Sequence, residues 1–477
     1  MVAELAGLVG DDNVWTDDES RVRHTRGKST PDLLKLRAGD ASDAPDAVVL
    51  PEDHEQVATI VAWCSERAVA LVPFGGGTSV VGGLAARRAG FAGVVALDVR
   101  RLNRLLHVDP ESCTATLEAG LLGPVAEALL AEHDLTLGHF PQSFEHASIG
   151  GFAATRSSGQ ASSGYGRFDD LVVGVRVATP LGTLELGKAP ASAAGPDLRA
   201  LVLGSEGAFG VITSVTVRVR RRPAVKVYEA WRFDSFLEGA AALRSLAQAG
   251  VAPTVLRLSD ESETALNLAQ SSERPNEVGS GSGGGCLMIT GFEGEQESVG
   301  ASRATVASRL TEVSGSPLGE AGGAAWAEGR FSGPYLRDSL LDAGVLVETL
   351  ETAAFWSNLG PVYDAVRTVL DRSLSDQGTP PIVLCHISHV YETGASLYFT
   401  VAAKQAADPL AQWGRAKSAA SDAMMAAGAT ITHHHAVGRD HKPWLAQEIG
   451  PVGVEVLRAV KERIDPRGVL NPGVLVP

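Results

Sequence analysis

Three adjacent histidines near the C-terminal end are the side chains best suited to acid–base chemistry in this sequence of 477 residues. Histidine titrates near neutral pH, so each of His433, His434 and His435 is a candidate base or hydrogen-bond donor. An isolated histidine is more simply explained by a polar loop, but three of the twelve histidines beside a glycine-containing turn favour the lining of a cleft. Neighbouring side chains point apart on a strand or a helix, so we predict no metal site here.

Three further polar side chains stand in apolar surroundings. Arg257 lies between two leucines and Arg337 follows Tyr-Leu, so each is either a surface arginine with its stem on the core or a ligand for an anion. Two such arginines together would suit a phosphate or a carboxylate, because a guanidinium donates two parallel hydrogen bonds. Tyr398 lies in an alternating apolar run, where it either packs within a strand or presents a phenol to a ligand.

A glycine-rich stretch at residues 72–83 predicts a phosphate-binding loop. It follows the apolar run at residues 69–72, and Gly75, Gly76 and Gly77 can take positive φ and point their N–H groups into a concave nest beside the Thr78 and Ser79 hydroxyls. Neither Gly-Lys-Ser/Thr nor Gly-x-Gly-x-x-Gly is present. Taken alone, the stretch could be an ordinary turn.

The elements around this loop form an α/β unit. Apolar residues at helical spacing predict a helix at residues 53–68, with strands before and after it. Two more glycine-rich blocks follow. The long polar block at residues 139–167 is typical of a loop that wraps a ligand, and the block at residues 201–220 predicts a glycine turn that leads into a long alternating strand. A run of arginines before Pro223 closes this domain.

The second half of the chain alternates strands and helices. We expect helices at residues 235–250, 295–315, 358–376 and 408–428, a strand or turn near residue 350, and a linker with Gly/Ser composition at residues 271–285. This pattern is typical of an α+β substrate domain.

Composition excludes several classes of protein. A net charge of −15 argues against a nucleic-acid partner. The four cysteines are isolated, so we expect reduced thiols. Neither a signal peptide nor a long apolar span is evident, which favours a cytoplasmic protein that is at most peripheral to a membrane.

The three glycine-rich blocks together resemble the FAD-binding domain shared by vanillyl-alcohol oxidase and p-cresol methylhydroxylase. The resemblance implies contacts with the pyrophosphate, isoalloxazine and adenine. In family members that tether FAD through the first loop a histidine follows the glycines, whereas Thr78 stands here, so we expect non-covalent FAD. The implied cofactor-binding residues are Pro73, Phe74, Gly75, Gly76, Gly77, Thr78, Ser79, Gln142, Ser143, Ser148, Gly150, Gly151, Thr155, Arg156, Ser157, Ser158, Glu206, Gly207, Gly210, Val211 and Ile212.

A narrower resemblance covers residues 45 to the end. The segments around Arg257, Arg337, Glu351, Tyr398 and the histidine triplet resemble the alkyldihydroxyacetonephosphate synthase family. That family replaces the acyl group of acyl-dihydroxyacetone phosphate by a fatty alcohol, without net redox, through an adduct on flavin N5. The resemblance implies that Arg337 binds substrate, that Tyr398 moves the proton, and that Arg257 with His433, His434 and His435 supports the site. Ala436 departs from the family's usual glycine.

A flavin dehydrogenase of 2-hydroxy acids is the alternative enzyme. Those relatives carry a His-x-Gly-Asp-Gly-Asn type of metal motif, which the stretch after His389 lacks, and His434 replaces their usual glutamate. A catalytically silent flavin-binding protein would leave the arginines, the tyrosine and the histidines without a reason to occur together.

The predicted fold is α+β: a two-subdomain FAD-binding domain of the p-cresol methylhydroxylase type and a cap domain with an antiparallel sheet. The expected ranges are an N-terminal arm at 1–44, the FAD domain at 45–223, the substrate domain at 224–430 and a C-terminal segment at 431–477 that returns to the FAD domain. The expected partners are the lipid substrates, with room for membrane contact and a homodimer.

Overall fold

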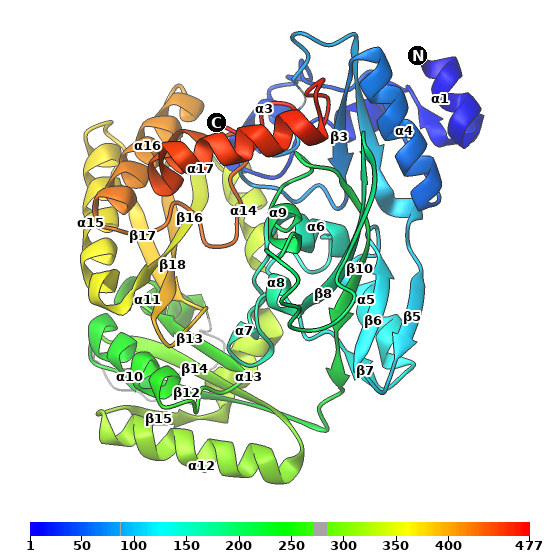
Figure 1. Cartoon of the computed structure of the whole chain (residues 1–477). Coiled ribbons are helices and arrows are strands. Elements are labelled where there is room, and N and C mark those ends of the chain that lie inside the picture. The colour runs from blue at the N-terminus through cyan, green and yellow to red at the C-terminus, as the bar shows by residue number, and fades with distance from the viewer. Residues whose placement is uncertain (86, 271–283) are drawn as a thin grey trace.

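The computed structural model describes residues 1–85, 87–270 and 284–477, and in it the chain folds around three larger β-sheets (Figure 1). Two sheets belong to the first half of the chain and the third belongs to the second half. The alternation of strands and helices confirms the predicted α+β class. The expected linker at residues 271–285 lies outside the described residues, except for its last two positions.

The first sheet carries the glycine-rich loop at the end of a buried strand. Its strands are β1 (Val14–Trp15), β2 (Ala47–Val49), β4 (Gly93–Asp98) and β3 (Val69–Phe74), in that order. β2, β4 and β3 run parallel, which suits their continuous apolar sequences. Helix α4 (His54–Arg67) connects β2 with β3; the Asp53 side chain caps its start and Ala68, in the left-handed conformation, ends it. α1 (Val2–Val9) shares the same core.

The second sheet is antiparallel. It contains β5 (Leu105–Asp109), β6 (Thr114–Glu118), β10 (Val211–Arg218), β8 (Val172–Thr179) and β9 (Gly182–Leu186). Its core includes side chains of α5 (Gly123–Ala131), α6 (Ile149–Thr155) and α8 (Phe168–Leu171). A short pair, β7 (Leu135–Thr136) and β11 (Arg220–Arg221), leads the chain out of this half.

The third sheet belongs to the second half of the chain. Its seven strands are β15 (Ser316–Gly319), β12 (Val225–Phe233), β14 (Cys286–Gly294), β13 (Val255–Ser259), β17 (Ile382–Ile387), β18 (Gly394–Lys404) and β16 (Val345–Phe355). Helices α10 (Phe236–Gln248), α12 (Gln296–Glu312), α15 (Trp356–Ser375) and α16 (Pro409–Ala426) contribute to one core with it. All four expected helices and the strand near residue 350 are therefore confirmed.

Both termini lie against the first half. The last helix, α17 (Lys442–Ile464), crosses the front of the molecule, and the segment after it pairs Leu470 with Leu71 of β3 (Figure 1). At the N-terminus, α2 (Asp18–Arg23) and α3 (Thr30–Arg37) run from the first sheet toward the third. The short elements between the sheets are η1 (Asp11–Asn13), η2 (Val99–Arg101), α7 (Ser162–Tyr165), α9 (Arg199–Val202), α11 (Glu261–Gln270), α13 (Glu320–Gly329) and α14 (Gly333–Asp342).

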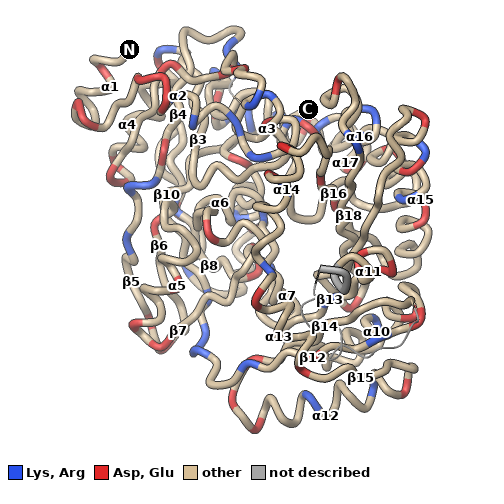
Figure 2. The backbone as a smooth tube through the Cα atoms, turned by 180° about the vertical axis from the view of Figure 1, so that it is seen from behind, with Lys and Arg blue, Asp and Glu red and all other residues tan. Residues whose placement is uncertain are grey.

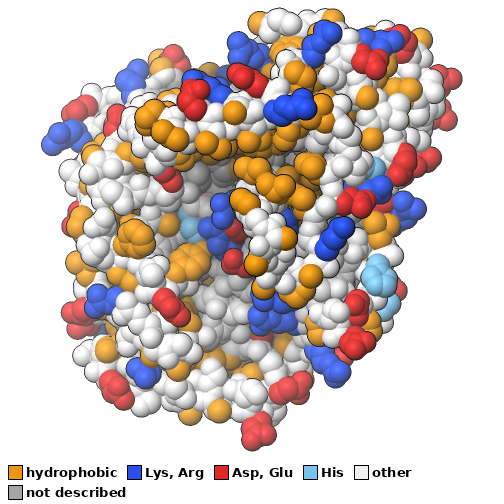
Figure 3. Space-filling model, in the orientation of Figure 1, with side chains coloured by type: hydrophobic (Ala, Val, Ile, Leu, Met, Phe, Trp, Pro, Cys, Tyr) orange, Lys and Arg blue, Asp and Glu red, His pale blue; other side chains and the backbone are white. Residues whose placement is uncertain are grey.

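Acidic and basic residues are interspersed along the backbone of both halves of the chain (Figure 2). Among the described residues, every helix is too short or too polar to cross a membrane. On the face shown in Figure 3 the surface is hollowed between the two halves, below an apolar band, and basic side chains and a histidine are visible inside the hollow.

Candidate functional site

Strand β18 presents Tyr398 on the face of the third sheet that turns away from its helices. Leu397 and Phe399, its neighbours along the strand, are fully buried in the core with α15, so Tyr398 points to the opposite face. The strand register places Glu351 of β16 and His386 of β17 directly beside Tyr398. Glu351, His386 and Tyr398 therefore lie side by side on three neighbouring strands, although they are 12 to 47 positions apart in the chain.

The Glu351 carboxylate organises the histidine triplet. It is almost completely buried and accepts hydrogen bonds from the backbone N–H groups of His433 (2.6 Å), His434 (3.2 Å) and His435 (2.9 Å). The Thr432 hydroxyl donates a fourth hydrogen bond, at 2.5 Å. Three consecutive N–H groups thus form a nest around one carboxylate, and the triplet is held in a turn beneath Tyr398.

The ionisation of Glu351 follows from this geometry. Burial on its own would raise the pKa of the carboxyl, but the positive charge that the neighbouring histidines gain when they are protonated, together with the Thr432 hydrogen bond, holds the pKa well below its usual value. At pH 7, where these histidines are neutral, the hydrogen bonds from Thr432 and from the three backbone N–H groups favour the carboxylate form. From the sequence, Glu351 is placed only in a segment that resembles the alkyldihydroxyacetonephosphate synthase family, and no role is predicted for it. Two glutamates, Glu348 and Glu351, in a largely apolar strand were the available signal.

Two of the three histidine rings contact the Tyr398 ring, and the third contacts Tyr391. The His434 ring is stacked with its centroid 6.0 Å from that of Tyr398, and the His435 ring meets it edge-on at 5.6 Å. His433 makes a 2.6 Å hydrogen bond from Nε2 to the Tyr391 hydroxyl. Burial lowers the pKa of all three histidines, well below the ordinary value for His433 and to about 3 for His435. All three are neutral at pH 7 and can accept protons.

Tyr398 differs from what its predicted role demanded. A tyrosine that acts as a base at neutral pH would need a pKa below its ordinary value, yet burial raises the pKa of Tyr398 to about 12. A hydrogen bond with Thr349 and the charge of Arg337 oppose that shift, whereas Glu348 and Glu351 add to it. The pKa of the phenol is therefore raised, because burial outweighs the Thr349 hydrogen bond and the Arg337 charge.

Arg257 reaches the tyrosine through a histidine. Its Nη2 atom lies 2.5 Å from Glu263 Oε1 and 3.0 Å from His386 Nδ1, and the His386 ring stacks on Tyr398 with centroids 4.8 Å apart. Burial and the Arg257 charge lower the pKa of His386. Burial opposes ionisation of Glu263, but His386 and Arg257 lower its pKa to about 2. Arg257 is thus an ion-paired support of the site, and His386 and Glu263 are members that sequence reasoning missed.

Arg337 lies on α14, at the edge of the same sheet. Its charge acts on Glu348 and Tyr398, and its buried Nε atom has no hydrogen-bond partner among the described residues. An unpaired guanidinium N–H that faces the site is free to bind an anion. The structure therefore brings Arg337, Tyr398 and the triplet together.

His389 joins the glycine-rich block at residues 139–167 to the triplet. Its Nδ1 atom lies 3.0 Å from the Ser158 hydroxyl and 2.7 Å from that of Ser162, and its ring stacks on His433. Nitrogen atoms of His389, His433 and His434 lie within 4.8 Å of one another, a spacing that a metal ion could use. Several of these nitrogens already carry hydrogen bonds, including the 2.9 Å contact between Nδ1 of His433 and Nδ1 of His434. The absence of a metal stays a prediction.

The glycine-rich loop is shaped by close backbone approach. Only Gly77 of the three glycines has positive φ, +68°, so the expected positive φ of Gly75 and Gly76 is wrong. A Cβ on Gly76 would lie 1.8 Å from the His146 carbonyl oxygen, and one on Gly75 would lie 2.3 Å from Ser148 Oγ. These two glycines let the loop pack against the second glycine-rich block.

The third glycine-rich block, at residues 201–220, packs against the same glycine-rich loop. A Cβ on Gly207 would lie 2.7 Å from the Pro73 ring, and the Glu206 carboxylate accepts hydrogen bonds from the N–H groups of Val437 and Gly438. Burial raises the pKa of Glu206 to about 7. Ser148 caps α6 through the N–H of Gly151, and Gly150 packs on Ala119. The other predicted positions in these blocks are Phe74 in β3, Gln142 and Ser143 before α6, Thr155 to Ser158 at its end, and Gly210 to Ile212 at the start of β10.

The residues present fit an extended polar cofactor. Within the described chain, the N–H groups of Gly76, Gly77 and Thr78 have no protein acceptor. Buried polar atoms of His139, Gln160, Ser163, Ser205 and Asn471 also lack partners there. Unpaired buried polar groups are costly, and a ligand with phosphate, ribose and heteroaromatic groups would satisfy them.

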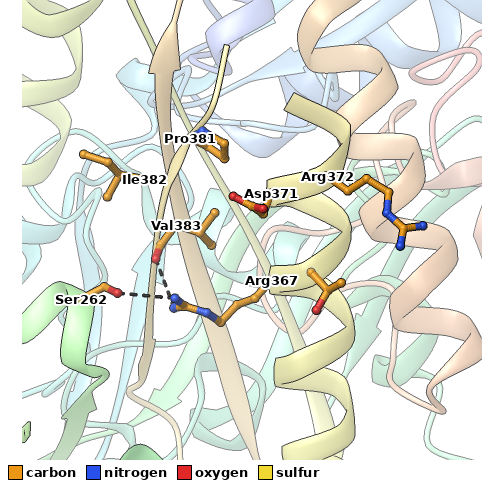
Figure 4. Close-up of a pocket in the computed structure, with 8 residues that line it drawn as sticks. Ser262, Arg367, Asp371, Arg372, Pro381, Ile382 and Val383 are labelled. Carbon is orange, nitrogen blue, oxygen red and sulfur yellow. Dashed lines mark hydrogen bonds between the residues drawn. The ribbon is translucent and has the colours of Figure 1, made fainter. Parts of the chain in front are cut away.

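A separate surface pocket lies away from this chemistry. Figure 4 shows it between α15 and β17, with Arg367 hydrogen-bonded to Ser262 and to the Val383 carbonyl oxygen. α15 packs on the face of the sheet opposite to Tyr398. The geometry of the histidine site, rather than this pocket, therefore identifies the functional centre.

Comparisons with known proteins relate both halves of the chain to FAD-linked proteins. The FAD binding domain family matches residues 45–187, and the family of C-terminal domains of FAD-linked oxidases matches residues 222–475. An alkyldihydroxyacetonephosphate synthase from Dictyostelium discoideum is 36% identical over all of this chain and 80% of its own length, and one from Trypanosoma brucei brucei is 32% identical with the same coverage. A solved alkyldihydroxyacetonephosphate synthase, 34% identical, superposes with a TM-score of 0.87 over 99% of this chain and 85% of its own. p-Cresol methylhydroxylase, 18% identical, shares the fold with a TM-score of 0.73 over 99% of this chain and 95% of its own.

Proposed function

Because the chain belongs to the alkyldihydroxyacetonephosphate synthase family of FAD-linked proteins, we propose that it replaces the acyl group of acyl-dihydroxyacetone phosphate by a fatty alcohol. The exchange breaks one carbon–oxygen bond and forms another, releases the fatty acid, and leaves the oxidation state of the substrate unchanged. FAD, when bound, supplies a reactive centre that holds the dihydroxyacetone phosphate unit between the two half-reactions.

The observation that carries the proposal is Tyr398 packed against neutral histidines over a buried, ionised Glu351. Exchange beside a ketone requires a proton to leave a carbon atom and later to return. A phenol with a pKa near 12 cannot be a resident anion at neutral pH. In the proposed reaction the Tyr398 hydroxyl gives up its own proton as it takes the substrate's proton, and the neutral imidazoles of His434 and His435, whose rings contact the phenol ring, are available to accept it.

Glu351 makes this relay feasible. His434 Nδ1 and His435 Nδ1 lie 3.6 Å and 3.8 Å from the Glu351 carboxylate oxygens. An imidazolium formed in a buried site is costly, and a carboxylate at this distance stabilises it. The same carboxylate fixes the backbone of the triplet, so that one group orients the acceptors and offsets their charge.

The substrate phosphate is assigned to Arg337. Its unpaired Nε atom and its position on α14, beside the sheet that carries Tyr398, support that role. Arg257 acts through His386, as a residue that positions the ring stacked on Tyr398. Contact with a membrane, from which the lipid substrates would be taken, is proposed for the apolar band on α17, where Val452 and Val456 are 76% and 52% exposed.

The decisive experiment mixes the purified holoprotein anaerobically with acyl-dihydroxyacetone phosphate and an isotope-labelled fatty alcohol. We expect labelled ether product and free fatty acid by mass spectrometry, with the flavin oxidised at the end of turnover. Permanent bleaching of the flavin by a 2-hydroxy acid, without ether formation, would instead identify a dehydrogenase. Flotation with anionic and neutral vesicles tests the membrane contact.

A further inference from the structure

The N-terminal arm contains a polar segment that is buried between the two halves. The segment comprises residues 24–30, which precede both matched family regions. His24, Thr25, Arg26, Ser29 and Thr30 are all buried, although none is apolar. Burial of so many polar groups is tolerated only where each is hydrogen-bonded, which implies specific partners on both sides.

One end of this segment holds the glycine-rich loop. The Lys28 N–H donates to the Ser79 carbonyl oxygen at 2.7 Å, and a Cβ on Gly27 would lie 2.0 Å from that oxygen. The His24 ring lies 4.4 Å from the Phe74 ring, which in turn meets Gly77, the glycine with positive φ. The arm therefore contacts the glycine-rich stretch at Phe74, before the three glycines, and at Ser79, after them.

His24 is itself firmly placed. Its Nε2 atom lies 2.7 Å from Asp98 Oδ2, at the end of β4, and its Nδ1 atom lies 2.6 Å from the Ser20 carbonyl oxygen. Asp98 is completely buried and also binds Arg100. Phe74 and Asp98 are paired in the first sheet, so the arm docks on the two strand ends that frame the loop.

The other end of the segment holds the third sheet. The Thr30 N–H donates to Glu348 Oε2 at 2.5 Å, and the Thr30 hydroxyl donates to the Val347 carbonyl oxygen. α3 then continues to Arg37, whose Nε atom lies 2.8 Å from Asp342 of α14, the helix that carries Arg337. Only Ser29 separates the residue bonded to the loop from the residue bonded to β16.

We propose that residues 24–30 are a clasp that belongs to the FAD site: they hold the glycine-rich loop in its binding shape and couple it to the substrate domain. Residues 24–30 thus pack against one side of the glycine-rich loop, and neither matched family region includes them. Because the linkage between Ser79 and Thr30 is so short, a shift of β16 or α14 displaces the loop, and FAD affinity depends on contacts in the other half of the protein.

Two substitutions of glycine by alanine test the first part. In Gly27→Ala the new methyl group must displace the Ser79 carbonyl, so the dissociation constant of FAD, titrated onto the apoprotein by fluorescence, should rise by about tenfold or more. Gly7→Ala is the matched control, because Gly7 lies in α1 with nothing within 4 Å of its Cβ position, and it should bind FAD as the unaltered protein does. Equal FAD affinity in Gly27→Ala and Gly7→Ala would overturn the clasp.

Thr30→Val tests the coupling. It keeps the volume of the side chain and removes only the hydroxyl that reaches Val347, on the substrate side, so folding should survive. We expect FAD to dissociate about threefold faster from Thr30→Val than from the unaltered holoprotein, as measured by capture of released flavin. An unchanged dissociation rate would reduce the arm to a local part of the loop and overturn the coupling. Neither measurement uses a substrate, so neither outcome depends on the proposed reaction.

Discussion

The glycine-rich loop and the histidine turn use the same backbone device in opposite ways. In the histidine turn, three consecutive N–H groups surround Glu351, a carboxylate of the protein itself. In the glycine-rich loop, the N–H groups of residues 76–78 have no acceptor within the described chain. A nest that is filled internally fixes side chains for chemistry, whereas a nest that is left open binds an external anion. We therefore propose that the glycine-rich loop, whose nest contains no carboxylate from the described residues, is the turn that binds the cofactor.

The open nest should be the more fragile of the two. Gly76→Val places a branched side chain where even a Cβ would lie 1.8 Å from the His146 carbonyl oxygen, so we expect loss of bound FAD. The substrate domain has its own core and should stay folded, as followed by circular dichroism. Gly300→Val, on the exposed face of α12, is the control. Stoichiometric FAD in Gly76→Val would mean that the loop is an ordinary turn.

Tyr398→Phe removes the hydroxyl that we propose moves the proton beside the histidine turn. Ring packing persists, so FAD content should be normal while turnover falls on the order of 10²-fold or more, the scale of a lost acid–base group. Tyr363→Phe is matched to it, because Tyr363 loses a buried hydroxyl on the opposite face of the sheet and should retain most activity. Comparable turnover in the two variants would remove Tyr398 from the mechanism.

Glu351→Gln keeps an oxygen in the filled nest and removes the charge. We expect about tenfold slower turnover, because an imidazolium beside an amide is less stable than one beside a carboxylate. Glu127→Gln alters a half-buried carboxylate outside the histidine turn, which accepts hydrogen bonds from Thr136 and from the N–H groups of Leu137 and Gly138. If both variants lose activity equally, the charge of Glu351 has no catalytic role.

The histidine turn should also weaken in acid. The pKa of His435 is lowered from 6.5 to about 3 in the folded protein, so the unfolded chain binds the proton more readily. The stability that this group contributes is complete above pH 6.5 and is lost progressively as the pH falls toward 3. Thermal unfolding between pH 7 and pH 4 should show a smaller decrease in Tm for His435→Gln than for the unaltered protein. Identical pH profiles would indicate that another group governs acid stability.

The smallest expected effect concerns Ala436, the residue that follows the histidine triplet. Ala436 has φ of +72°, which is unfavourable for a residue with a Cβ, and the related synthase family usually has glycine there. Ala436→Gly should stabilise the protein by about 1 kcal/mol, measured as an increase in the denaturant midpoint. A decrease in the midpoint would show that the Ala436 methyl group contributes more by packing than its backbone conformation costs.

The sequence by itself determined the elements and the chemical types. Apolar periodicity predicted α4, α10, α12, α15 and α16, because each helix buries one face at a spacing that can be counted along the chain. The first glycine-rich block by itself indicated a phosphate-binding loop and the polar side chains indicated an acid–base site, since residue types limit the available chemistry. FAD followed from the resemblance of the three glycine-rich blocks to a known FAD-binding domain.

Only the tertiary structure decided how these residues act. The pairing of β16 with β18 sets Glu351 beside Tyr398, and the turn after α16 brings three N–H groups to the same carboxylate. Burial then raises the pKa of the phenol and lowers those of the imidazoles, a reversal that no local pattern encodes. The contact of the N-terminal arm with Ser79 is equally nonlocal. Register, burial and domain contact depend on residues far apart in the chain, and a single sequence does not specify which of them meet.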